Sequence, residues 1–187
     1  YTELAEGVWY PVGGMYAGIE ALTKVAEKLG VRFVYNAAVK SIKAEGNRVH
    51  AAETEGGQVY EADLFVGNAD LPYIYKELLP KNAEAEKLDK KLYTCSTIMF
   101  YWGVDKAYPE IAHHNVFLGG DYKASFDQIF NEHSLPEQPS FYVHAPARTD
   151  PGAAPAGQET LYVLVPVGHM DQSNEHEWPK MVERARE

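Results

Sequence analysis

The sequence is poor in cysteine, in positive charge and in long hydrophobic runs, and each shortage excludes a class of protein. Its 187 residues include one cysteine, Cys95, which excludes an internal disulfide and a CxxC zinc or redox site. The chain has 17 basic residues against 27 acidic ones and a net charge of -10. Such a surface repels phosphate backbones, so we expect no nucleic-acid partner. No apolar run approaches the roughly 20 residues of a membrane-spanning helix.

The short motifs of several enzyme classes are also missing. The sequence has no G-x-S-x-G nucleophile elbow and no H-E-x-x-H metal motif. Glycines 13, 14 and 18 lie at the start of a helical pattern, but their spacing is not G-x-G-x-x-G, so they predict a turn before a packed helix. His113 and His114 are neighbours, and neighbouring side chains on a strand point to opposite faces. We therefore interpret the histidines as scattered, without a shared metal site.

The residues that are present predict a folded protein that mixes helices and strands. Hydrophobic residues make up 45% of the chain, which is enough for a substantial core. A 3.6-residue apolar period predicts a helix over residues 17–29, and alternation between glycine turns predicts a β meander over residues 31–60. The meander is expected to begin with a strand at 31–35, and a short buried strand is expected at 64–66.

The second half of the chain predicts a mostly antiparallel sheet with flanking helices. A helical segment broken at Pro80 covers residues 71–92, and a long apolar strand follows at 94–104. Further strands are expected at 115–118, 140–145 and 160–165, and helices at 125–130 and 178–187. The predicted fold class is therefore α+β or α/β.

Six blocks of sequence, taken in order, resemble the phytoene desaturase family, a branch of the amine-oxidase-like flavoproteins. They are Trp9–Met15, Asn36–Lys40, Gly67–Asp70 with Tyr75–Pro80, Ala112–Asn115, Phe141–Pro146 with Thr149–Pro151, and Tyr162–Val167 with His169. The resemblance covers nearly the whole chain. It implies a FAD-binding Rossmann-like domain and a substrate domain on a mostly antiparallel β-sheet. Both glycine-rich flavin motifs of the family are missing, which predicts an internal fragment.

The resemblance also divides the chain into three parts. Residues 1–70 would belong to the FAD-binding domain, residues 71–93 would form a helical connection, and residues 94–187 would form a substrate domain truncated at its C-terminus. The implied activity is FAD-dependent dehydrogenation of a long hydrophobic polyene in carotenoid biosynthesis. The fragment alone is expected to be inactive, and the intact enzyme to be cytoplasmic with peripheral membrane contact.

Other functions stay open at this point. Within the same superfamily, the chain could belong to a carotenoid isomerase, a carotenoid oxygenase-like relative or an amine oxidase-like oxidoreductase. From another class, it could be a non-catalytic domain that binds a hydrophobic ligand.

One flavin contact is implied by the resemblance. Val39 follows Asn36 on a strand, and the matching valine of the family lies beside the adenine of FAD and pairs with it through backbone groups. The alternative is an ordinary core valine.

The substrate contacts are predicted on one strand and one loop. A substrate without polar groups needs an apolar tunnel, and Ile98, Phe100 and Trp102 are expected to form its wall, although large aromatic residues more often fill a core. His144, Arg148 and Asp150 lie in a loop that resembles the family and are expected near the substrate. The alternative role of Asp150 is to stabilise a turn with Pro151 and Gly152. No catalytic residue is assigned.

Overall fold

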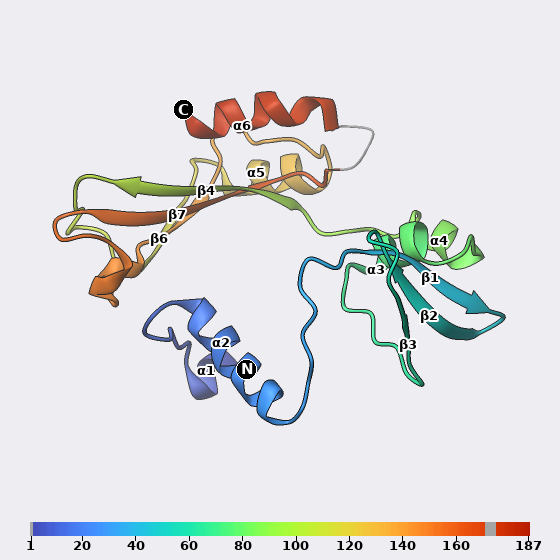
Figure 1. Cartoon of the computed structure of the whole chain (residues 1–187). Coiled ribbons are helices and arrows are strands. Elements are labelled where there is room, and N and C mark those ends of the chain that lie inside the picture. Colours follow the sequence, from blue (N-terminus) through green and yellow to red (C-terminus); the bar gives the residue numbers. More distant parts are fainter. Residues whose placement is uncertain (1, 171–174) are drawn as a thin grey trace. The chain divides into compact units, whose positions relative to one another are not determined.

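The computed structural model describes residues 2–170 and 175–187, and the chain divides into two compact units. Unit 1 combines residues 1–29 with residues 93–187, and unit 2 contains residues 30–92. Each unit has its own antiparallel sheet (Figure 1), which confirms the predicted mixture of helices and antiparallel strands. The three-part division expected from the resemblance stays a prediction.

Unit 1 is built on a four-stranded sheet in the order β4-β7-β6-β5. Its strands are β4 (Ser96–Val104), β5 (His114–Phe117), β6 (Phe141–His144) and β7 (Glu159–Val167). The two long strands pair over their whole length, from Ser96 opposite Val167 to Val104 opposite Glu159. All four strands lie where apolar alternation predicted them, because β-branched and aromatic residues suit a half-buried pleated surface.

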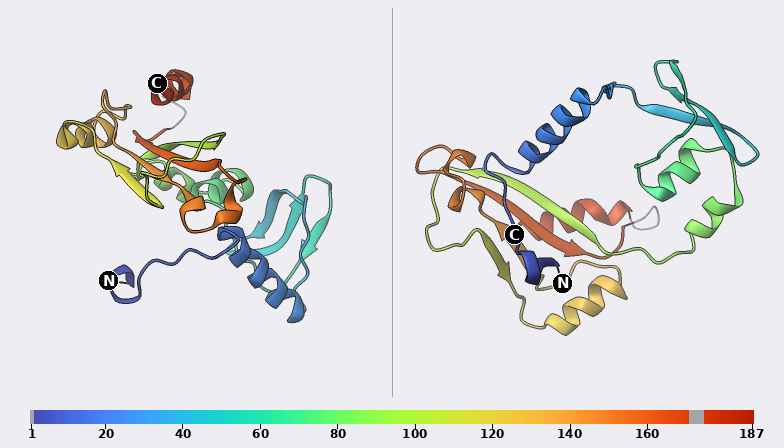
Figure 2. Two further views of the ribbon diagram at one scale, coloured as in Figure 1. Left: turned by 90° about the vertical axis from the view of Figure 1, so that its left-hand side faces the viewer. Right: turned by 90° about the horizontal axis from the view of Figure 1, so that it is seen from below.

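One face of this sheet carries the core of unit 1. Alternate residues of the strands meet there, as the two-residue period requires: Ile98, Phe100, Val143, Val163, Val165 and Val167, joined by Leu135. The C-terminal helix α6 (Trp178–Arg186) covers part of this face (Figures 1 and 2). Its contacts are spaced by three and four residues, as on an amphipathic helix: Trp178, Met181, Val182 and Ala185.

The remaining helices of unit 1 begin where the local sequence provides a start. Helix α5 (Tyr122–Phe130) follows Asp121, whose carboxylate accepts a hydrogen bond from the Ala124 N–H at 2.9 Å. Three short 3₁₀ helices, η2 (Pro146–Arg148), η3 (Pro151–Ala153) and η4 (Glu175–Glu177), lie in the connections.

The N-terminal part of unit 1 contains α1 (Thr2–Glu6) and α2 (Met15–Lys28). Gly13 and Gly14 precede α2 with φ of 92° and 88°, which confirms the predicted glycine turn, because this left-handed region is readily accessible to glycine. The predicted apolar face of α2 is present, but none of its residues is buried in the described part of the chain.

Unit 2 is a small three-stranded sheet with a helical segment. The strands β1 (Val39–Glu45), β2 (Arg48–Thr54) and β3 (Val59–Glu61) pair in sequence order (Figure 2). The helical segment consists of α3 (Leu71–Tyr73), the π-helix η1 (Ile74–Leu78) and α4 (Ala83–Leu88). The predicted interruption at Pro80 is confirmed.

Two strands predicted in unit 2 are wrong. Residues 31–35 and 64–66 have irregular backbone, and Leu64 and Val66 are 78% and 84% exposed. A strand needs a neighbour to satisfy its backbone N–H and C=O groups. Neither segment pairs with another among the described residues. In the same described ranges, no helix is both long and apolar enough to cross a bilayer.

Gly168 provides a test of the close packing beyond β7. A Cβ added to Gly168 would lie 2.1 Å from the backbone carbon of His133, and the Gly168 N–H donates to the Ser134 carbonyl at 3.0 Å. We expect Gly168→Ala to lower the free energy of unfolding by about 1–3 kcal/mol, because backbone atoms must move apart. Gly103→Ala is the control, since its added Cβ meets nothing within 4 Å. Urea unfolding measures both, and equal effects would contradict this packing.

Candidate functional site

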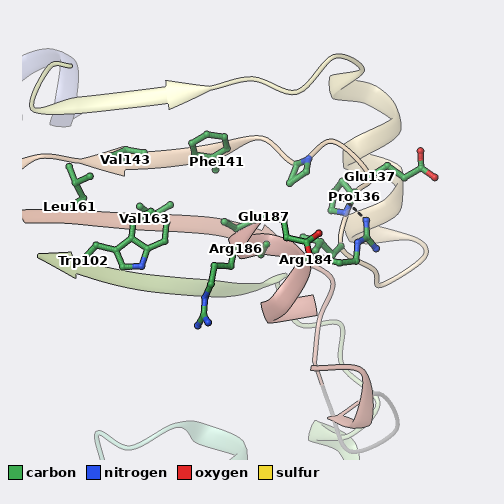
Figure 3. A pocket seen from close by; sticks show the side chains of 14 residues that line it. Trp102, Pro136, Glu137, Phe141, Val143, Leu161, Val163, Arg184, Arg186 and Glu187 are labelled. Atoms are coloured by element: carbon green, nitrogen blue, oxygen red, sulfur yellow. Dashed lines mark hydrogen bonds between the residues drawn. The ribbon is translucent and has the colours of Figure 1, made fainter. Parts of the chain in front are cut away.

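An apolar cavity of about 540 Å³ opens on the core face of the sheet, beside the end of α6. Side chains from three strands form its floor (Figure 3): Trp102, Phe141, Val143, Leu161, Val163 and Val165. The segment of residues 135–139 and the last residues of the chain form its sides. A cavity of this size and lining suits a hydrophobic ligand held by shape and apolar contact.

Charged groups lie only at the edge of this cavity that is formed by α6 and residues 135–139. Arg184 reaches toward the Pro136 carbonyl, at 3.4 Å (Figure 3). The Arg186 guanidinium lies 5.8 Å from the centroid of the Phe100 ring, a cation–π distance. The floor is therefore apolar while this edge is polar.

The three residues predicted as a substrate wall share one face of β4 but have different environments. Ile98 and Phe100 are 2% and 7% exposed and belong to the core. Trp102 is 38% exposed, lines the cavity and stacks on Phe100 with ring centroids 5.3 Å apart. The structure thus brings Trp102 alone of the three to the cavity, and substrate contact stays a prediction for all of them.

The opposite face of the sheet carries a histidine cluster, defined as His113, His114 and His144. The Nε2 atoms of His113 and His144 lie 2.8 Å apart, and the Nδ1 atom of His113 lies 2.6 Å from the Thr149 hydroxyl. The Nδ1 atom of His114 lies 2.6 Å from the Tyr142 hydroxyl. The interpretation of these histidines as scattered is therefore wrong.

The cluster was missed because the alternation argument treated His113 and His114 as residues of one strand. His113 precedes β5, where the backbone does not alternate, and only His114 lies in the strand. His114 is directly opposite His144 in the β5–β6 register, which sequence spacing alone does not specify. Among the described residues, no group of three or more His, Cys, Asp or Glu side chains is placed to hold a metal ion.

Burial shifts the ionisation of this cluster. Desolvation lowers the pKa of His144 below its ordinary value, and the neighbouring imidazoles of His113 and His114 lower it further. Desolvation and His114 lower the pKa of His113 in the same way. Burial and the nearby Tyr162 raise the pKa of the Tyr142 hydroxyl. Both half-buried imidazoles thus favour the neutral form.

The N-terminal loop of residues 7–14 contacts this cluster. The Tyr10 ring meets the His113 and His144 rings edge-on, with centroids 4.9 Å and 5.8 Å away. The Gly13 N–H donates to Asp150 Oδ2 at 2.8 Å, and the Gly152 N–H donates to Asp150 Oδ1 at 3.0 Å. Asp150 therefore stabilises its own turn, as its alternative role predicts, and also holds a segment 137 residues away.

Arg148 forms a buried ion pair at the end of η2. Its guanidinium bonds Glu159, the first residue of β7, whose side chain is fully buried. Among the described residues, Arg148 Nε and Glu159 Oε1 have no hydrogen-bond partner. The predicted role of Arg148 near a substrate stays a prediction, and the contact that the structure shows is this ion pair.

Val39 lies on the open edge of the sheet in unit 2. The Ala38 carbonyl accepts from the Glu55 N–H at 2.9 Å, while the Thr54 N–H donates to Gln58. Val39, directly opposite Thr54, is therefore a non-hydrogen-bonded residue whose backbone N–H and C=O point away from β2. The side chain is 37% exposed. This arrangement fits a planar group that pairs with backbone atoms at a strand edge.

Comparison with known proteins decides the family. Residues 1–175 match the flavin containing amine oxidoreductases. The chain belongs to this family. Within it, a zeta-carotene-forming phytoene desaturase from Myxococcus xanthus is 52% identical over 170 residues, which are 90% of this chain and 33% of that protein. A phytoene desaturase from Cercospora nicotianae is 48% identical over 179 residues, 94% of this chain and 29% of that protein.

Other relatives match at lower identity. A 4,4'-diapolycopene oxygenase from a Methylomonas species is 36% identical over 172 residues, 91% of this chain and 35% of that protein. The chain spans about a third of the length of the curated relatives it matches.

Proposed function

We propose that this chain is the internal part of a FAD-dependent carotenoid desaturase that dehydrogenates a linear polyene of the phytoene type. The observation that carries the proposal is the 52% identity to a zeta-carotene-forming phytoene desaturase over 170 residues. The 36% identity to an oxygenase is lower over a similar length, which favours desaturation over oxygenation. Bound FAD would accept the hydride from the polyene.

The part of this chain in the reaction is to hold a hydrocarbon and exclude water. A polyene has no polar group for recognition, so its binding must come from apolar contact and shape. The cavity floor beside Trp102 offers such contact over three strands. Since a polyene dissolves in the bilayer, we also propose that the whole protein contacts a membrane surface.

The flavin contact is proposed at the edge of unit 2. The outward backbone groups of Val39 can pair with the adenine of FAD without a charged side chain. The uncovered apolar face of α2 and the exposed side chains of Leu64 and Val66 support a role as part of a larger flavoprotein, because apolar surface of this extent is normally covered.

A chimeric enzyme tests the proposed function. The segment of the Myxococcus xanthus protein that matches this chain is replaced by the corresponding residues of this chain. We expect the chimera to bind flavin and to convert phytoene in liposomes to products with longer conjugation, and Trp102→Ala in it to reduce conversion while flavin content stays unchanged. Absorption spectra and chromatography of the extracted carotenoids measure both.

The parent Myxococcus xanthus enzyme is the positive control, and Tyr101→Ala is the matched variant on the other face of β4, where the side chain is 75% exposed. A chimera that carries its flavin but leaves phytoene unchanged would contradict the proposed function. Equal losses from the Trp102 and Tyr101 variants would contradict the assignment of the cavity.

A further inference from the structure

The contact between His113 and His144 has room for one proton only. Their Nε2 atoms lie 2.8 Å apart, a hydrogen-bond distance at which one nitrogen must donate and the other must accept. Two N–H groups facing each other would clash, and two lone pairs would repel. The pair is therefore complete with one shared proton, and a second proton at this contact breaks it.

The surroundings of the pair oppose a second positive charge. The His114 ring lies 4.4 Å and 5.5 Å from the rings of His113 and His144, and Tyr162 on β7 lies 6.2 Å from His144. The charged side chains nearby have other partners. Asp150 accepts hydrogen bonds from Gly13 and Gly152, and Arg148 is paired with Glu159. Burial lowers the pKa of both imidazoles, which also opposes a second positive charge.

The loop of residues 7–14 depends on this region for its attachment. Its apolar side chains Val8, Trp9 and Val12 are 73%, 84% and 80% exposed, so they contribute little burial. The Tyr10 ring, by contrast, is half-buried against the two imidazoles, and the Gly13 N–H is bonded to Asp150. Of these two attachments, the contact of the Tyr10 ring depends directly on the histidine pair.

We propose that His113 and His144, sharing one proton, form a latch that holds the loop of residues 7–14 through Tyr10, and that a second proton opens this latch. This second proton is present at the contact only when both imidazoles are fully protonated, so that each presents an N–H to the other. Two imidazolium groups at 2.8 Å repel each other, so their rings separate and the surface that Tyr10 contacts is lost. Asp150 keeps its bond to Gly13, so the loop is loosened at one of its two attachments. This inference does not depend on the proposed reaction.

Hydrogen exchange of the full 187-residue chain tests the latch. Backbone exchange of residues 7–14 is compared at pH 7.5 and pH 5.5 by mass spectrometry, after correction for the intrinsic pH dependence. We expect the corrected exchange of this segment to be about tenfold faster at pH 5.5, while β4 and β7 stay protected. Equal corrected protection of residues 7–14 at the two pH values would overturn the proposal.

Two variants separate the histidine pair from other titrating groups. His144→Gln retains an amide that can bond His113 but cannot take a second proton there, so we expect its loop protection to be the same at both pH values. His176→Gln, an exposed histidine in η4, is the control and keeps the pH response. A pH response that persists in His144→Gln overturns the latch, and the wild-type pH series decides the question if that variant does not fold.

Discussion

Replacing Arg148 by methionine is expected to lower the free energy of unfolding by about 3–5 kcal/mol. The Glu159 side chain is fully buried, and its Oε2 atom is bonded by Arg148 Nη2. Methionine fills much of the same volume but leaves the carboxylate without a countercharge, and a buried unpaired charge is costly. Urea unfolding followed by tryptophan fluorescence measures the change.

The matched control removes both charges. In the double variant Arg148→Met with Glu159→Gln, no unpaired charge remains, so we expect much of the lost stability to return. A double variant as unstable as Arg148→Met alone would show that shape and not charge determines the loss. A single variant with unchanged stability would contradict the buried pair.

The second large effect concerns Ile98, which the sequence assigned to a substrate wall. Ile98 is 2% exposed and lies within the core cluster of the sheet. We expect Ile98→Ala to lower the free energy of unfolding by about 2–5 kcal/mol, because it leaves a cavity among packed side chains. The same urea titration measures the effect.

Trp102→Leu is the comparison on the same face of β4. Trp102 is 38% exposed at the cavity, so its replacement removes less buried surface, and we expect a clearly smaller loss of stability. Polyene conversion by the chimeric enzyme completes the test. Ile98→Ala with full stability and reduced conversion would contradict a core role and favour the wall.

Local pattern predicted most elements of this fold. The alternation in β4 and β7 and the 3.6-residue period of α2 need only near neighbours along the chain. The strands expected at 31–35 and 64–66 failed because a strand exists only with a paired neighbour, and apolar residues alone do not show whether that neighbour is present. The exposure of the apolar face of α2 could not be predicted for a similar reason, since periodicity shows which face is apolar but not what covers it.

The site was less predictable than the fold. Trp102 could be assigned to an apolar surface from its strand, but the difference between Trp102 and Ile98 depends on which residues from other elements pack over each of them. The pairing of Arg148, the last residue of η2, with Glu159 spans the 3₁₀ helix η3, and the meeting of His113 with His144 depends on strand register. Contacts between side chains on different elements are not specified by spacing in the sequence.

The bond between Gly13 and Asp150 has a consequence for how the protein is made. Unit 1 combines residues 1–29 with residues 93–187, so its first segment leaves the ribosome well before its sheet exists. Unit 2 is continuous and can fold during this interval, whereas the loop of residues 7–14 cannot make its contacts with His113, His144 and Asp150 until those residues have been synthesised. We expect nascent chains to depend on chaperones during this interval. The contact between Gly13 and Asp150 joins residues 137 positions apart, and such non-local contacts form slowly.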